Sequence, residues 1–390
     1  MLVRIANKLV VFMRHLLFGL GLISLHAYSF SATAADTFTV DDIVISNPFI
    51  PQFDIEFSPV GNLIAWQDVQ QNLWAAAVDP DTGGFMPRSG QGVLIDTGLA
   101  PAVSTGNGPE WLFSKNGLEI IYTKINEGIM SLARARFTGS SWDLEPVAFT
   151  DNKYNVLGST DLGDPFPRIV YQELPRTTYW REINDPSSEA LVPEDSIFHS
   201  SWIKQERALV ITARVSRNLQ CARYDLDSQE ISPISYTRSE KRFGKVWRAP
   251  ELGNDRVAFC VVGSRDSERI EIYHEQANGW RLINIITPPS LNYLYSPEYF
   301  VHNGKSYLVF ITLNTTVDIY SSHGDVWVAG IDPASSFYRK VSGPDQINRI
   351  DPEVFITPQE VYVYYTETVK NAKGTTWVTH RCTTGLGPSL

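Results

Sequence analysis

Acidic residues recur in this sequence at the start of strand-like hydrophobic segments, often directly after a proline. The pattern occurs as GPEWLF from Gly108, APELGN from Ala249, SPEYF from Ser296 and DPEVFI from Asp351. Carboxyl groups that a fold brings together can accept backbone N–H bonds, hold a cation such as Ca²⁺, or divide into acids and bases as in glycoside hydrolysis. Which of these applies depends on the elements that position them.

These acidic residues belong to a repeated unit of about 50 residues. The segment FDIEFSPVGNLIAW from Phe53 aligns without a gap with PEWLFSKNGLEIIY from Pro109. Weaker copies begin near Asp164, Phe198, Ala249, Pro297 and Pro352. Each copy indicates a strand, a turn of Gly, Asn or Asp, and a second strand rich in aromatic and β-branched residues, and further strand-like runs follow.

Seven such units predict an all-β fold, a seven-bladed β-propeller of four-stranded antiparallel blades. A six-bladed ring is the alternative, because the unit from Asp164 to Glu194 is short. The seventh unit ends in TTGLGPSL, which is too rich in Gly and Pro for a strand. We therefore expect the N-terminal segment TFTVDDIVIS (37–46) to pair beside the strand Thr376–Cys382 and to close the ring.

Two short motifs support a resemblance to known families. F-S-P-x-G-x-x-I-A-W at 57–66 and F-S-K-N-G-x-x-I-I-Y at 113–122 resemble the repeat of TolB-like (WD40-like) β-propellers. That resemblance implies a fold more than a function, because the repeat serves scaffolds, peptidase accessory domains and lyases alike. More weakly, the Pro-Glu openings at Glu251, Glu298 and Glu353 resemble the inner-strand starts of five-bladed glycoside hydrolase propellers.

The repeat predicts a ring of side chains at one mouth of the central channel, because the first strand of each blade lines that channel. The aligned positions hold Asp54, Glu110, Asp164, His199, Glu251, Glu298 and Glu353. The candidate catalytic residues are Glu298, Glu251, Glu353, His199, Glu110 and Asp54. His199 is the exception, either as a general acid or base or as a neutral polar residue at a tolerant position.

Recurrence in every blade also favours a structural role, in which each carboxylate accepts N–H bonds from the next blade. We predict no cofactor and no metal site. If the carboxylates did bind a metal ion, Ca²⁺ would suit their oxygen ligands. Trp111 and Tyr299 follow two of these glutamates. They could form an aromatic wall for sugar rings or pack between blades.

The N-terminus predicts export. Arg4, Lys8 and Arg14 precede the apolar run LLFGLGLISL and a small-x-small site at Ala32–Ala34, so residues 1–34 are predicted as a signal peptide and 35–390 as one propeller domain. We expect a periplasmic or secreted protein that behaves as a monomer and has no membrane association after cleavage. Any two of Cys221, Cys260 and Cys382 could form a disulfide. The sequence contains no C-x-x-C motif that would indicate a structural zinc site.

Charge limits the partners. The sequence has 33 Lys and Arg against 43 Asp and Glu, a formal net charge of −10, which disfavours nucleic acid. Two functions fit: a protein that acts on or binds carbohydrate through an acidic channel mouth, with a glycoside hydrolase or lyase as its catalytic form, or a non-catalytic TolB-like module that docks a protein partner. Unpaired carboxylates with perturbed pKa values in an open mouth would favour the first.

Overall fold

The computed structural model separates Met1–Thr37 from the unit Phe38–Leu390, and only the second unit contains described residues. The structure describes residues 43–390 except 47–51, 87–91, 115–116, 162–165, 175, 194–199, 264–267, 290, 292, 316–321, 336, 345–346 and 372–373. The predicted signal peptide, Asp164 and His199 lie outside the described residues.

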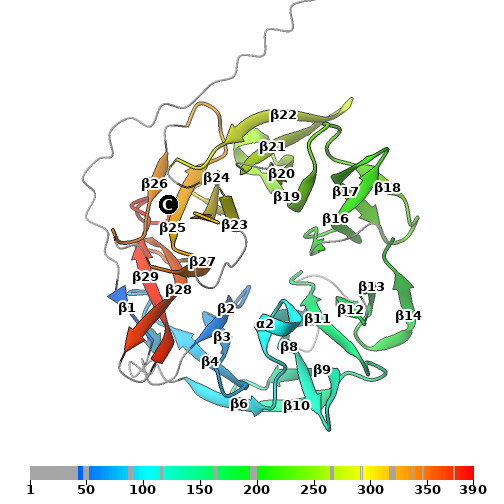
Figure 1. Ribbon diagram of the computed structural model, residues 1–390, viewed down its shortest axis with the longest axis vertical. Coiled ribbons are helices and arrows are strands. Elements are labelled where there is room, and N and C mark those ends of the chain that lie inside the picture. Colours follow the sequence, from blue (N-terminus) through cyan, green and yellow to red (C-terminus); the bar gives the residue numbers. More distant parts are fainter. Residues whose placement is uncertain are drawn as a thin grey trace, which may run out of the picture. The chain divides into compact units, whose positions relative to one another are not determined.

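Seven antiparallel sheets follow one another along the described chain and stand around a central axis (Figure 1). We number these blades in chain order. Blade 1 contains β2 (Phe53–Phe57), β3 (Leu63–Gln67), β4 (Asn72–Val78), β5 (Phe85–Met86) and β6 (Val93–Thr97). The short helix α2 (Ala102–Thr105) leads to blade 2, with β7 (Glu110–Ser114), β8 (Gly117–Asn126), β9 (Ile129–Phe137) and β10 (Trp142–Pro146).

Blades 3 to 5 repeat this order from the axis outward. Blade 3 contains β11 (Lys153–Gly158), β12 (Arg168–Glu173), β13 (Thr177–Glu182) and β14 (Asp185–Leu191). Blade 4 contains β15 (Ser201–Trp202), β16 (Ala208–Val215), β17 (Asn218–Asp225) and β18 (Ile231–Pro233). Blade 5 contains β19 (Lys241–Ala249), the 3₁₀ turn η1 (Pro250–Leu252), β20 (Asp255–Gly263), β21 (Glu268–Gln276) and β22 (Gly279–Ile286).

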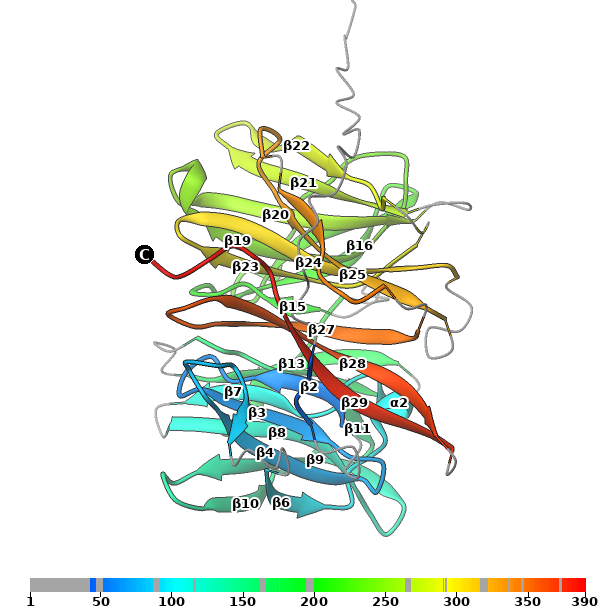
Figure 2. The same ribbon diagram turned by 90° about the vertical axis from the view of Figure 1, so that its left-hand side faces the viewer.

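The last two blades complete the ring. Blade 6 contains β23 (Tyr293–His302), β24 (Lys305–Leu313), β25 (Gly324–Gly330) and β26 (Tyr338–Lys340), and blade 7 contains β27 (Arg349–Ile356), β28 (Val361–Asn371), β29 (Gly374–Thr383) and β1 (Ile43–Val44). β1 pairs with β29, Ile43 opposite Arg381 and Val44 opposite His380. The seven-bladed prediction and its closure by an N-terminal strand are therefore confirmed. Figure 1 shows β1 beside β29, and Figure 2 shows β27, β28 and β29 of the same blade from the side.

The blades are held together by apolar cores between neighbours. In the described residues, each of the seven junctions has its own buried cluster. Both faces of a blade are covered, so the second strands carry nearly continuous hydrophobic runs: from Ser306 to Leu313 every residue of β24 is buried. Such runs are typical of strands that are buried on both faces. The inner strands, β2, β7, β11, β15, β19, β23 and β27, are thereby fixed around the axis.

A β-bulge recurs in the inner strands and turns their side chains toward the channel. The ladder to the second strand shifts register in five blades. At each shift one residue has a positive φ, and these residues are Asp54, Asn155, Phe243, Ser296 and Asp351. In three of these strands a glutamate follows two residues after the residue with positive φ. The bulge therefore directly precedes a glutamate of the channel wall.

Two of the predicted inner strands are wrong. In blade 3 the inner strand is β11, and the residues from Phe166 lead into the second strand, β12. In blade 5 the inner strand is β19, and Glu251 lies in the turn η1 after it. The observed inner strands β11 and β19 have the sequences KYNVLG and KRFGKVWRA. Neither sequence contains the Pro-Glu pair from which the alignment started.

The alignment of blade 1 with blade 2 is shifted by two residues. Glu56 pairs with Ala65, as Glu110 pairs with Ile121 in blade 2. The turn between β2 and β3 is longer than the turn between β7 and β8, which an alignment without gaps cannot accommodate. Side chains alternate with period two along a strand, so a shift of two residues keeps the side chain on the same face of the blade. The shift therefore places Glu56, instead of Asp54, at the position equivalent to Glu110.

Candidate functional site

One layer of the channel wall carries three of the six predicted acidic residues. The seven inner-strand residues opposite equivalent positions of the second strands are Glu56, Glu110, Leu157, Ser201, Lys245, Glu298 and Glu353. Glu110, Glu298 and Glu353 were predicted in this layer, and the prediction missed Glu56 and Lys245. The layer lies within the strands, so these groups line the channel rather than its entrance.

Four consecutive blades, 6, 7, 1 and 2, contribute the glutamates, and we call Glu298, Glu353, Glu56 and Glu110 the acidic arc. Among the described residues, the side chains of Glu56, Glu110 and Glu353 have no hydrogen-bond partner. Burial raises the pKa of all three. Neighbouring carboxylates raise the same pKa values further, Glu110 acting on Glu56 and Glu298 acting on Glu353.

Asp54 and Asp351 form a second acidic pair beside the arc. Both occupy the bulge position, in blades 1 and 7, and their carboxyl groups lie within hydrogen-bonding reach of each other when one of them is protonated. The backbone N–H of Gly108 also donates to Asp54. Burial raises the pKa of Asp54 to about 6, although these hydrogen bonds oppose the shift, and it raises the pKa of Asp351 as well. The two groups therefore share a proton more readily than they both ionise.

Lys245 is the cation of this layer. Its ammonium forms an ion pair with Glu298 across the junction of blades 5 and 6. Burial alone would lower the pKa of Lys245, but the charge of Glu298 raises it overall. The same ammonium lowers the pKa of Glu110 and of Glu353 against the effect of burial. Lys245 is thus the counter-charge for one end of the arc.

Glu251 does not join the other candidates. Its carboxylate accepts the backbone N–H of Ser306 at 2.8 Å and the Ser306 hydroxyl at 3.0 Å. Ser306 begins the buried part of β24 in the next blade, so Glu251 fastens blade 5 to blade 6. This is the structural role that the sequence offered as one alternative, and at Glu251 it leaves no free carboxylate for a ligand.

The two aromatic residues that follow glutamates have different positions. Trp111 is 2% exposed, and its indole N–H donates to the backbone carbonyl of Glu56 at 2.8 Å, so it packs between blades. Tyr299 instead stacks on Trp247 with ring centroids 4.8 Å apart and planes at 13°. Burial raises the pKa of Tyr299 to about 12, which keeps its hydroxyl protonated at neutral pH. Tyr299 lines the cavity described next.

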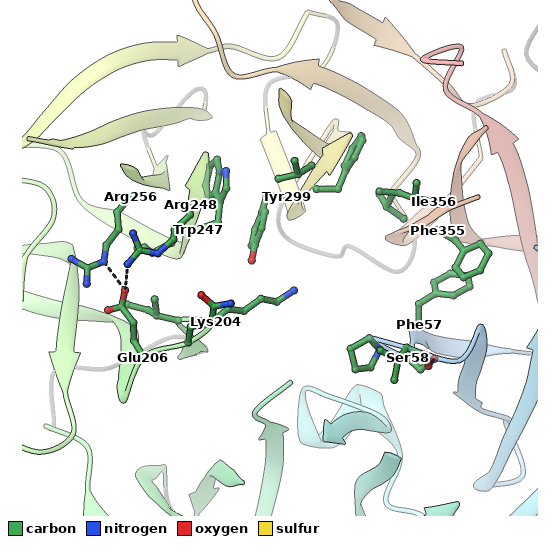
Figure 3. A pocket seen from close by; sticks show the side chains of 18 of the residues that line it. Phe57, Ser58, Lys204, Glu206, Trp247, Arg248, Arg256, Tyr299, Phe355 and Ile356 are labelled. Carbon is green, nitrogen blue, oxygen red and sulfur yellow. Dashed lines mark hydrogen bonds and ion pairs between the residues drawn. The ribbon is translucent and has the colours of Figure 1, made fainter. Parts of the chain in front are cut away.

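A cavity of about 550 Å³ opens at the end of the channel where the inner strands finish. Blades 1, 4, 5, 6 and 7 contribute to it, and we call it the mouth pocket (Figure 3). Aromatic and aliphatic side chains from blades 1 and 7 form one side, among them Phe57, Phe355 and Ile356. Its size is typical of a site for a small molecule or for a few side chains of a partner. Sequence reasoning did not predict this pocket.

Cations gather on the opposite side of the mouth pocket. The Glu206 carboxylate forms ion pairs with the guanidinium groups of Arg256 at 2.6 Å and Arg223 at 3.3 Å. The Arg248 guanidinium lies 3.8 Å from the same carboxylate. One half-buried carboxylate therefore serves three guanidinium groups, and the Arg248 side chain stays 51% exposed. Lys204 extends from blade 4 into the pocket (Figure 3). Burial and the charge of Lys245 lower the pKa of Lys204.

No three carboxylate, imidazole or thiol groups in the described part of the chain are arranged so that they could hold a metal ion. Within the same residues, no helix has both the length and the apolar character of a membrane span. Cys221, Cys260 and Cys382 are buried, and none of them forms a disulfide within the described residues.

Several solved structures are similar to this chain. The β-propeller domain of Cps50 (Swd1) from Myceliophteria thermophila aligns with 88% of this chain and 99% of its own, at 11% identity and a TM-score of 0.51. The WD40 domain of SCAP from fission yeast aligns with 89% of this chain and 98% of its own, at 9% identity and a TM-score of 0.51. TolB from Acinetobacter baumannii aligns with 86% of this chain and 79% of its own, at 11% identity and a TM-score of 0.41.

No protein-family model and no curated protein sequence matches the chain. At 9 to 11% identity, the similarity to Cps50 and SCAP concerns the fold alone. The resemblance to WD40-like propellers is confirmed at that level: the chain is a seven-bladed β-propeller with the fold of the WD40 domains.

Proposed function

We propose that this protein is a non-catalytic interaction module that binds a segment of a partner protein in the mouth pocket. The observation that carries the proposal is the pocket itself. It lies at the channel end, is shared by five blades and combines aromatic walls with cations that are not fully neutralised. Concave sites with apolar walls and a few placed polar groups are the usual form of a recognition site.

A blocking variant tests this function. The wild-type protein is screened against a random peptide display library, and the selected peptides are measured again on Gln205→Trp, whose larger side chain should obstruct the pocket. Gln205 lines the pocket and is exposed. Asp143→Trp, on the exposed outer strand β10, is the matched control. We expect peptide binding to survive in the control and to fall at least tenfold in Gln205→Trp. Failure to select any peptide, or equal binding by both variants, would overturn the proposal.

A glycan-directed enzyme is the second candidate, and the acidic arc favours it. Glu353, whose pKa is raised, is influenced by Glu298, which is ion-paired with Lys245. A protonated carboxyl near a charged one is the pair that glycoside hydrolysis needs. The test is release of reducing ends or unsaturated products from a panel of polysaccharides. Activity that disappears in Glu298→Gln and in Glu353→Gln would replace our first proposal with this one.

The location of the protein stays a prediction from the N-terminus. We propose that the segment 1–34 directs export to the periplasm or the medium, where the module would meet its partner as a monomer. Cell fractionation with a C-terminal epitope tag tests the location, and a mature N-terminus after Ala34 is the expected result. Recovery of the uncleaved chain in the cytoplasm would contradict it.

A further inference from the structure

The mouth pocket has two chemically different sides, and this asymmetry narrows the class of ligand. On the side of blades 1 and 7, Phe57 and Phe355 stack with centroids 5.0 Å apart and planes at 28°. Ile356 beside them is 39% exposed. A large aliphatic side chain so exposed at the rim of a cavity provides apolar surface that a ligand can cover. This side contributes few hydrogen-bonding groups and suits an apolar side chain.

The opposite side presents an unpaired cation. Lys204 has no ion pair or hydrogen bond among the described residues. Its ammonium lies 6.0 Å from the centroid of the Tyr299 ring. Figure 3 shows the Lys204 side chain extending into the pocket toward Tyr299, while Glu206 turns to Arg248 and Arg256. Lys204 therefore keeps its donors available to a ligand.

The glutamates of the acidic arc do not line the pocket, although the charges of Asp161 and Glu298 act on Lys204 from outside it. Glu56, Glu110, Glu298 and Glu353 are not among the residues that line it. In β2, β23 and β27 the lining begins one residue after the glutamate, at Phe57, Tyr299 and Val354. The pocket itself contains Lys204, Arg248 and Arg256 against Glu206. An anionic group of the ligand complements that balance.

From this complementarity we propose that the mouth pocket recognises a peptide segment in which an acidic residue adjoins an aromatic or aliphatic one. The carboxylate would bind Lys204 and Arg248, and the apolar side chain would lie against Phe57, Phe355 and Ile356. An acidic sugar satisfies the cations equally well, but a sugar leaves the aliphatic side without a partner. This inference rests on the interaction module proposed above and adds the chemistry of its ligand.

The experiment has two readouts: the amino-acid composition of the selected peptides, and the change in their binding when the charge of Lys204 is removed. Peptides selected from a random library by the wild-type protein are sequenced and measured on Lys204→Met, which keeps the length of the side chain without its charge. Lys305→Met is the matched control, because Lys305 is exposed and lies outside the pocket. We expect Asp or Glu beside Phe, Leu, Ile or Trp among the selected sequences. We also expect about tenfold weaker binding by Lys204→Met and unchanged binding by Lys305→Met.

Each other result has a defined meaning. Selected peptides without acidic residues, or binding that Lys204→Met leaves unchanged, would overturn the ligand class and leave the interaction module standing. Loss of binding in both lysine variants would also overturn it, because the effect would then reflect overall charge. An acidic glycan bound on an array, with no peptide selected, would overturn the ligand class and the proposed function together. Thermal melting of both variants checks that the ring remains folded.

Discussion

Two parts of the channel wall treat charge in opposite ways. Blades 6, 7, 1 and 2 place four glutamates in one layer, whereas the same layer holds Leu157 and Ser201 in blades 3 and 4. The mouth pocket beyond this layer carries its cations on the side of blades 4 and 5. A purely structural carboxylate would recur in every blade. The one-sided arrangement in this propeller is therefore not explained by a repeated structural role alone.

A second contrast lies within the acidic residues themselves. Glu251 has its carboxylate bound by Ser306 of the next blade, while Glu110 in the arc has no such partner. The first arrangement should contribute stability and the second should cost it, because an unpaired buried charge is unfavourable. The contrast can be tested by substitution, and the largest expected effect comes from the cation that balances the arc.

Replacing Lys245 should destabilise the protein most. Lys245→Met removes the partner of Glu298 and leaves the arc without its cation. We expect a loss of about 2 kcal/mol in the free energy of unfolding, below the values for fully buried pairs because both side chains are partly exposed. Urea denaturation measures it. The double variant Lys245→Met/Glu298→Gln should recover most of the loss, and an unchanged midpoint in Lys245→Met would show that the pair does not balance the arc.

Removing the carboxylate of Glu251 should have a smaller effect. Glu251→Ala leaves the buried backbone N–H and the hydroxyl of Ser306 without their acceptor. The expected loss is about 1.5 kcal/mol, since two hydrogen bonds to a charged group disappear. Chemical denaturation of Glu251→Gln, which keeps one acceptor oxygen, should show about half that loss. Equal free energies of unfolding for wild type and Glu251→Ala would contradict the claim that Glu251, unlike the glutamates of the acidic arc, stabilises the fold.

The arc should make stability depend on pH with a defined sign. The pKa values of Glu56, Glu110, Glu353 and Asp351 are raised, and that of Asp54 is about 6. Above the ordinary carboxyl pKa, the folded state therefore binds more protons than the unfolded chain. Stability from these groups is complete at lower pH and is lost as pH rises through the raised values. We expect a lower Tm at pH 8 than at pH 5.

Glu110→Gln should weaken that dependence, because it removes one titrating group from the arc. At pH 8 we expect a Tm higher by about 2 °C, and at pH 4 no difference, since the carboxyl is then protonated in both states. Differential scanning calorimetry across this pH range provides the measurement. A lower Tm for Glu110→Gln at pH 8 would mean that the Glu110 carboxylate has a stabilising partner.

The sequence predicts the fold of this protein better than its site. Turn residues and alternating aromatic and β-branched strands recur often enough to indicate seven blades, and the missing last strand indicates closure through the N-terminal segment. The inner strands are harder to place, because a bulge and turns of different length shift their register by two residues. A gap-free alignment therefore matches Asp54 with Glu110 and passes over Glu56, although the alternation in FDIEF contains both.

The mouth pocket could not be predicted from single motifs. Lys204, Trp247, Tyr299 and Phe355 lie far apart in the sequence and meet only because the ring closes. Lys245 occupies the layer in a strand that has no Pro-Glu opening, so repetition gave no signal for it. Pairing between strands determines such positions, and it depends on the whole fold rather than on local residue types.

Hydrogen–deuterium exchange in the presence of a selected peptide tests the central claim most directly, because it shows where on the propeller the ligand lies. We predict slower exchange in Ile203–Glu206, Val246–Arg248, Tyr299–Val301 and Val354–Ile356, which surround the mouth pocket. The outer strands β10 and β14 should be unaffected. Protection confined to those outer strands, with none around the pocket, would contradict the account.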